Sequence, residues 1–333
     1  MGERNQHNKG GLFSETYRPE KGGIFIMIHF YQTQENAVRQ IQEPAPGCWI
    51  SVIDPTAQEV QQLIEGYGLD SGFVKSSLDE EESSRIERED DQTLIIVDTA
   101  MSEIQTEETI LFFTVPLGII ITKNYVFTIS LRDNQVLRDM ADGVVRGVQT
   151  RMKTRFVMQL LLRITAIYLQ DLKQIDKTSY IMEQKLNTAM KNKELIQMLE
   201  LEKSLVYFST SLKANEVTIE KLLRGRTIKL YDEDQDLLED VLIEVRQAIE
   251  MSNIYSGIIS SMVEAFGSVI SNNLNIVMWR LTVVTIIMSI PTMVFSFYGM
   301  NTEHLPVPDT WFPTLFSVVV TGITAYIMLK QKK

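Results

Sequence analysis

The chain has little cysteine and little histidine, and each scarcity excludes a class of site. Its 333 residues include one cysteine, Cys48, and three scattered histidines. A single cysteine excludes a disulfide within the chain and a thiolate metal cluster, and it suits a reducing compartment. No glycine-rich phosphate-binding loop and no catalytic constellation is present. We therefore expect neither an enzyme nor an organic cofactor.

Proline is absent from the middle of the chain. Residues 117–290, a stretch of 174, contain none and are rich in Leu, Glu, Lys, Gln and Met, which favours long helices. We expect a helical region over 151–231. A longer helix over 232–300 opens on acidic residues and meets no stop signal before Gly299. At 1.5 Å per residue that helix would be roughly 100 Å long.

The part before residue 150 alternates strand and helix signals, which predicts a mixed α/β domain over 27–150. The β-branched run Trp49–Ile53 reads as a strand. A helix follows it, with Asp54 as N-cap and Pro55 in the first helical position. Residues 1–26 are polar and read as a disordered tail or an extension before Met27, without the apolar run of a signal peptide. Further strands are expected over 93–101, 109–115 and 119–131, the last broken by a turn at 123–124.

Two runs near the C-terminus lack charged residues altogether. Residues 281–298 hold no charge across 18 positions, and 311–329 hold none across 19. Each run is close to the roughly 20 residues that a helix needs to cross a bilayer. We expect two transmembrane helices, the first over about 279–298. The alternative is a pair of buried core helices.

The loop between these runs, residues 299–310, has no Lys or Arg. Basic residues instead flank the outer ends of the pair, with Arg280 before the first run and a basic tail over 330–333. The positive-inside tendency therefore places both termini in the cytosol and the loop outside a cell membrane.

The net charge of −11 leaves the chain short of basic surface. Nucleic acid is therefore an unsuitable partner, because phosphate backbones bind Lys and Arg. The acidity suits a protein that handles cations, but it would also simply keep a soluble domain dispersed.

Small or polar residues recur along the predicted long helix. With Met278 placed between Asn275 and Thr282, their spacings alternate between four and three. This 3.5-residue period is typical of helices that meet around a common axis. One interpretation is close packing between membrane helices, and the other is a wall of a water-filled path. The polarity continues beyond the apolar run, and two spans per chain enclose no pore unless copies assemble, which favours the second. We call these positions the polar face: Glu264, Ser268, Ser271, Asn275, Met278, Thr282, Thr285, Ser289, Thr292, Ser296 and Gly299.

The first apolar run ends in Tyr298-Gly299-Met300-Asn301. A ring of Asn301 side chains would offer neutral amide oxygens to the waters of a hydrated Mg²⁺, which loses its shell reluctantly. Such binding is weak enough to permit release. Glu303 in the loop would concentrate cations, although ordinary solvation also explains it.

The Gly-Met-Asn tripeptide between two C-terminal spans resembles the CorA family of divalent-cation channels. The resemblance extends from about Met27 to the end, and Ile-Ile-Thr-Lys-Asn at 120–124 is similar to a recurrent family segment. It implies a homopentamer with a funnel-shaped cytosolic domain and long stalk helices. It also implies a selectivity filter at Gly299, Met300 and Asn301, a hydrophobic constriction at Leu281, polar pore rings at Thr292 and Asn275, an acid near the cytosolic end at Glu264, and an inter-subunit regulatory carboxylate at Asp240 with Glu103 as a candidate partner.

The expected function is influx of magnesium, with cobalt as a second ion, down the membrane potential. Mg²⁺ would be both cargo and regulator, bound between subunits on the cytosolic side. Two alternatives remain open from the sequence. One is a zinc, cobalt or nickel transporter of the same architecture, and the other is a membrane-tethered scaffold that conducts nothing.

Overall fold

The computed structural model describes residues 28–106, 109–189, 192–224, 228, 231–300 and 311–330. These residues form two compact units that do not follow chain order. The first draws on the described parts of Met1–Asp98, Val115–Arg163 and Thr218–Leu238, and the second on those of Thr99–Thr114, Ile164–Val217 and Glu239–Lys333. The domain boundaries expected at 150 and 231 stay predictions.

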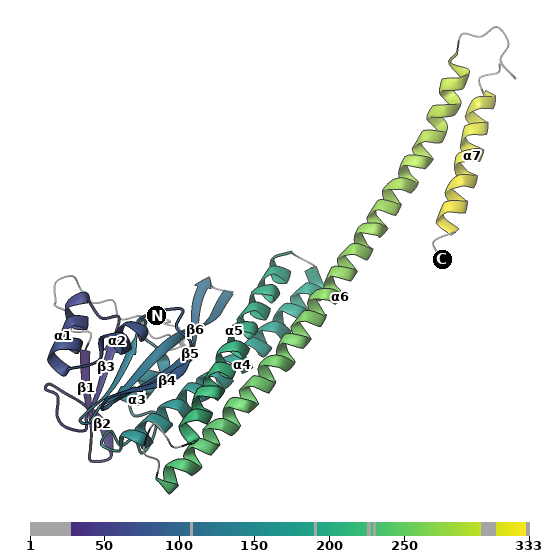
Figure 1. The fold of residues 1–333 in the computed structure, drawn as a ribbon. Coiled ribbons are helices and arrows are strands. Elements are labelled where there is room, and N and C mark those ends of the chain that lie inside the picture. The colour runs from purple at the N-terminus through teal and green to yellow at the C-terminus, as the bar shows by residue number, and fades with distance from the viewer. Residues whose placement is uncertain are drawn as a thin grey trace, which may run out of the picture. The chain divides into compact units, whose positions relative to one another are not determined.

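A seven-stranded sheet runs in the order β2-β1-β3-β7-β6-β5-β4 (Figure 1). Its central pair, β3 and β7, is parallel, while β1 pairs antiparallel with β2 and β3, β6 with β7, and β4 with β5. The strands are β1 (Ile28–Gln34), β2 (Ala37–Ile41), β3 (Trp49–Ile53), β4 (Arg85–Glu89), β5 (Gln92–Thr106), β6 (Thr109–Ile121) and β7 (Val126–Ser130).

The core of the first unit forms on β3 and β7. Trp49 is fully buried, stacks on Tyr31 at 4.7 Å between ring centroids, and donates from Nε1 to Thr128 Oγ1 at 2.8 Å. The short helices α1 (Ala57–Tyr67), α2 (Ser71–Ser76) and α3 (Gln135–Ala141) also belong to this unit. The predicted strand at 49–53 is confirmed.

The predicted start of α1 is wrong by two residues. The N-cap is Thr56, not Asp54, because Thr56 and Glu59 form a reciprocal capping box. The Thr56 side chain accepts from the Glu59 N–H, and the Glu59 carboxylate accepts from the Thr56 N–H. This box satisfies two amide donors at once, which a single Asp54 cap would not. Asp54 instead adopts a positive φ of 47°.

The predicted turn at 123–124 is confirmed, because it lies between β6 and β7, but the predicted gap at 116–118 is wrong. β6 continues through Pro116 to Ile121, and the break comes later, before β7. Proline lacks an N–H for a ladder hydrogen bond. The register of β6 with β7 begins at Leu117, so Pro116 lies outside that ladder.

The long helices of the proline-free stretch are α4 (Lys153–Ala189), α5 (Asn192–Leu223) and α6 (Asp232–Tyr298), and α7 (Trp311–Lys330) follows. The α6 helix has the 67 residues that its missing stop signals predict. In the second unit the rings of Tyr168 on α4 and Phe208 on α5 pack edge to face, with 5.1 Å between their centroids. The Ser252 hydroxyl of α6 donates a hydrogen bond to the Leu205 carbonyl oxygen at 2.9 Å. On α4 the apolar residues at helical spacing are all buried: Phe156, Leu160, Ile164, Ile167 and Leu172. On α5 the burial of apolar residues is incomplete, since Leu199 and Val206 are exposed.

Candidate functional site

The outer part of α6 presents two opposite faces. Every residue of the polar face, from Glu264 to Gly299, is exposed. These residues occupy two positions of a seven-residue repeat, so that Thr282 and Ser289 share one register while Thr285 and Thr292 share the other. A seam of this kind stays on one side of a helix over many turns. The structure thus keeps the hydroxyl groups in a single line.

The opposite face of α6 is covered within the chain. Val283 is 4% exposed, and Ile287, Ile290 and Val294 are half-buried at matching positions of the repeat. The α7 helix runs beside this part of α6 and buries Ser317 to 2% (Figure 1). Within the described residues, α7 therefore packs on the side of α6 that lacks hydroxyl groups.

Four hydroxyl groups of the polar face donate to carbonyl oxygens of their own helix. Thr282 Oγ1 donates to Met278 O at 2.8 Å and Thr285 Oγ1 to Leu281 O at 2.9 Å. Ser289 and Thr292 make equivalent bonds at 2.8 and 3.1 Å. Bonds of this type use the hydroxyl proton inside the helix. The oxygen lone pairs then remain as acceptors on the exposed side.

The helix ends where the Gly-Met-Asn segment begins. The Gly299 N–H donates to Phe295 O at 2.9 Å, and the Met300 N–H to Phe297 O at 3.4 Å. A Cβ at Gly299 would lie 3.2 Å from the Phe295 oxygen, so this last turn leaves little room for a side chain. Met300 is 53% exposed. The remaining candidates at the mouth, Asn301 and Glu303, lie outside the described residues.

The two candidate regulatory carboxylates, Glu103 and Asp240, are both exposed. Among the described residues no hydrogen bond or ion pair joins them, and no group of three or more His, Cys, Asp or Glu side chains is placed to hold a metal ion. Glu244, one turn after Asp240, has a raised pKa because of partial burial and, secondarily, the charge of Asp240.

The sequence pattern did not single out Asp171. This residue is 5% exposed in α4, and burial raises the pKa of its carboxyl from 3.8 to about 7. The signal was present, because Asp171 falls between Ile164, Tyr168 and Ile175, all of them buried. A charged residue on the apolar face of a helix marks a buried titratable group.

The apolar windows of α6 and α7 are almost entirely uncovered, with 6% of the first and 11% of the second buried within the described structure. A soluble core helix would be mostly buried, so the alternative of two core helices is wrong. A family described as CorA-like Mg²⁺ transporter protein matches residues 45–331. The chain belongs to this family.

Members of the CorA-like family in archaea and bacteria share most of the chain's length. The cobalt/magnesium transport protein CorA of Methanocaldococcus jannaschii is 29% identical over 296 residues, covering 85% of this chain and 90% of its own. That of Thermotoga maritima is 21% identical over 318 residues, covering 91% and 88%.

Solved structures agree with the fold. The complete CorA magnesium transporter of M. jannaschii superposes with a TM-score of 0.75 at 26% identity, covering 92% of this chain and 98% of that one. The full-length CmaX protein has a TM-score of 0.67 at 15% identity, covering 94% and 100%, and shows the fold alone. The expected α/β domain, long helix and second C-terminal helix are thereby confirmed. The chain is a membrane protein of a transporter family that is not a family of enzymes.

Proposed function

We propose that the chain forms a channel-like transporter that carries Mg²⁺, with Co²⁺ as a second ion, along a path lined by the polar face of α6. The relatives from M. jannaschii and T. maritima, both named cobalt/magnesium transport protein, support the choice of ions. The observation that carries the proposal is the two-sidedness of α6. Its hydroxyl groups are exposed on one side, while α7 and the half-buried aliphatic residues occupy the other.

The chemistry of the polar face suits a hydrated dication. Mg²⁺ holds its waters tightly, and those waters present hydrogens outward. A wall of acceptors stabilises such an ion without stripping its shell. Four hydroxyl groups of this face donate their hydrogen to backbone carbonyl oxygens of α6, so their oxygens are left to accept hydrogen bonds from the ion's waters. They belong to Thr282, Thr285, Ser289 and Thr292. Neutral acceptors bind a dication weakly enough for it to move on.

A single chain supplies one wall, so the path requires several copies around an axis. The polar face has the period of a helix seam, which brings symmetry-related helices together along its length. Isoleucines exposed on the cytosolic part of α6 support further contact between copies, since large exposed apolar side chains commonly mark interfaces. They are Ile243, Ile254 and Ile258, at 62%, 56% and 41% exposure. We propose a symmetric, funnel-shaped homopentamer, the assembly that the family resemblance implies.

The mouth of this path is assigned to Gly299, Met300 and Asn301, with Glu303 attracting cations at the entrance. We place this mouth outside the cell and both termini in the cytosol, from the distribution of basic residues. The membrane potential then drives entry. An elementary charge gains about 2.3 kcal/mol per 100 mV, so a dication gains roughly twice that.

Gating is assigned to two places. Leu281, 59% exposed on α6 near the cytosolic end of the span, is proposed as the hydrophobic constriction, with Asn275 and Glu264 below it. Asp240 is proposed to bind cytosolic Mg²⁺ together with Glu103 of a neighbouring copy. Bound Mg²⁺ would hold the α6 helices closed, and its loss would release them.

Purified protein in liposomes with a negative-inside potential tests the function. We expect saturable entry of Mg²⁺, reduced by external Co²⁺. The same assay with Zn²⁺ and Ni²⁺ distinguishes the alternative transporter from the proposed one. For the alternative, Zn²⁺ or Ni²⁺ flux would exceed Mg²⁺ flux. Liposomes that admit no divalent ion would leave only the non-conducting scaffold and would end the proposal.

A further inference from the structure

Two adjoining pockets in the first unit share Lys153 and Thr154 as a common wall. One has a volume of about 660 Å³ and lies between the start of α4 and the start of α6, where Tyr231 and Asp234 close it. The other, about 540 Å³, lies between the start of α4 and the end of β6. Both volumes fall within the range of small-molecule sites, about 300–1,000 Å³.

The charge of these pockets is opposite to that of the chain. The net charge is −11, yet the basic residues that line the two pockets outnumber the acidic ones. The helix α4 also begins at Lys153, so the positive end of its dipole points toward the shared wall. A cavity with this field attracts an anion. The basic lining residues are Arg88, Lys123, Arg151, Lys153 and Arg155.

Lys153 has a positioning role in this wall. Its Nζ donates to the carbonyl oxygens of Thr122 and Lys123, each at 2.7 Å, and burial lowers its pKa. These bonds tie the start of α4 to the turn after β6. The bonds also hold the backbone of Lys123 next to the shared wall. The Lys123 side chain is exposed there.

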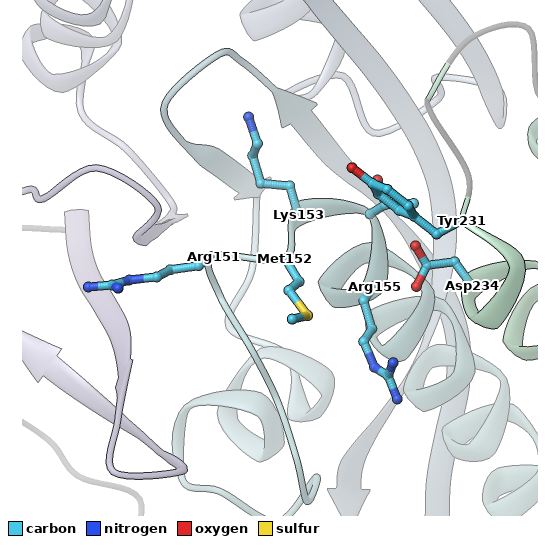
Figure 2. A pocket seen from close by; sticks show the side chains of 7 residues that line it. Arg151, Met152, Lys153, Arg155, Tyr231 and Asp234 are labelled. Atoms are coloured by element: carbon cyan, nitrogen blue, oxygen red, sulfur yellow. The ribbon is translucent and has the colours of Figure 1, made fainter.

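The basic groups are spread out and do not converge on one point. Figure 2 shows Lys153 and Arg155 leaving the start of α4 in opposite directions, with Arg151 pointing away from Tyr231 and Asp234. Such spacing suits an extended anion with several charges better than a single phosphate. Beside it lies apolar surface, because Tyr231 is 60% exposed and Met152 58% exposed.

We propose that the two pockets together bind a free polyphosphate anion of the nucleoside-polyphosphate class. The phosphate chain lies along the shared wall, between Lys123 and Arg155. The base stacks on Tyr231, which offers an aromatic face. Asp234, 5% exposed and directed into the first pocket, accepts a hydrogen bond from the nucleoside. The site has no glycine-rich loop, and it does not depend on the proposed transport function.

Calorimetry on the purified full-length protein tests this site, with ATP, tripolyphosphate and adenosine as probes at constant Mg²⁺. We expect ATP and tripolyphosphate to bind competitively and adenosine to bind much more weakly. Lys123→Gln and Arg155→Gln should each lower the affinity for both anions by at least about tenfold, the usual loss for a charge-assisted contact. Tyr231→Leu should lower the affinity for ATP alone, which distinguishes nucleotide binding from binding of inorganic polyphosphate.

Two variants make the same change of charge elsewhere in the first unit. Lys75→Gln and Arg146→Gln remove exposed basic groups outside both pockets and should leave both affinities unchanged. Folding of each variant is checked by its melting temperature, which ATP should raise in the wild type. Absence of saturable binding would overturn the proposal. Equal weakening by pocket and control variants would also overturn it, because the binding would then be diffuse charge attraction.

Discussion

Asp171 is a buried carboxyl in a helical unit whose other core residues are mostly apolar. Its pKa is raised to about 7 because burial penalises the charged form. The folded protein therefore holds this proton more tightly than the unfolded chain does. The stabilisation from the neutral form is complete below about pH 4 and is lost as pH rises through about 7. Over that window the loss amounts to about 4 kcal/mol at most.

Asp171→Asn should remove this pH dependence, because asparagine has a similar shape and does not ionise. We expect the melting temperature of the wild type to fall by several degrees from about pH 5 to about pH 8, and that of the variant to fall less. The matched control is Asp176→Asn, which neutralises an exposed aspartate of the same helix and should retain the wild-type slope. Equal slopes for all three proteins would show that Asp171 does not titrate in this range.

Gly118 of β6 lies directly against Ser77, the residue that caps the C-terminus of α2. A Cβ at this position would lie 2.0 Å from Ser77 Oγ and 2.3 Å from Ser77 Cβ. Gly118→Ala should therefore destabilise the first unit by about 1–3 kcal/mol or more. Removing the Ser77 side chain should recover part of this loss. In denaturation experiments the double variant with Ser77→Gly should be more stable than the one with Ser77→Ala, which keeps the clashing Cβ. No difference between them would refute this explanation.

At the scale of elements, the sequence predicted best where one strong signal ran without competition. The 67 residues of α6 followed from missing prolines and missing stop signals, and neither depends on tertiary contacts. The start of α1 was misjudged because two capping signals, Asp54 and Thr56, stood two residues apart. The reciprocal bonds of Thr56 with Glu59 decided between them.

The continuity of β6 and the exposure of part of α5 could not be predicted locally. Proline interrupts a strand only where its missing N–H would have formed a ladder hydrogen bond. The pairing register of β6 decides this, and the sequence alone does not give that register. Likewise, Leu199 and Val206 match a helical period without being buried. Within the candidate site, the polar face followed from spacing alone. The basic pockets did not, since they join residues far apart in the sequence.

The polar face of α6 makes a prediction at this scale. Thr292→Val keeps the shape of the side chain and removes the hydroxyl. Liposome flux of Mg²⁺ should fall by at least about fivefold, since each lost hydrogen bond to the ion's waters costs about 1 kcal/mol and every subunit loses one. Thr324→Val, which removes a hydroxyl from α7, should leave flux near that of the wild type. Equal effects of the two variants would deny the polar face its special role.

At the scale of the whole molecule, gating should depend on contacts between copies. Asp240→Ala removes a carboxylate that belongs to no metal-binding group of three or more His, Cys, Asp or Glu side chains among the described residues. We expect inhibition of flux by cytosolic Mg²⁺ to require at least about tenfold more Mg²⁺ in this variant. Asp236→Ala, which removes an exposed acid one turn earlier, should preserve normal inhibition. Unchanged inhibition in Asp240→Ala would discard the regulatory role of this carboxylate.

The central claim is that the polar face of α6 lines the ion path in the assembled protein. Cys48 is the single native cysteine and is buried, so engineered cysteines report cleanly once it is replaced by serine. The decisive measurement is block of liposome Mg²⁺ flux by a charged, membrane-impermeant thiol reagent. Thr285→Cys, Ser289→Cys and Thr292→Cys should each be modified and lose flux. Val284→Cys, which is exposed on α6 but lies outside the polar face, should conduct normally. Block at Val284→Cys, or undiminished flux through the three modified polar-face variants, would contradict the account.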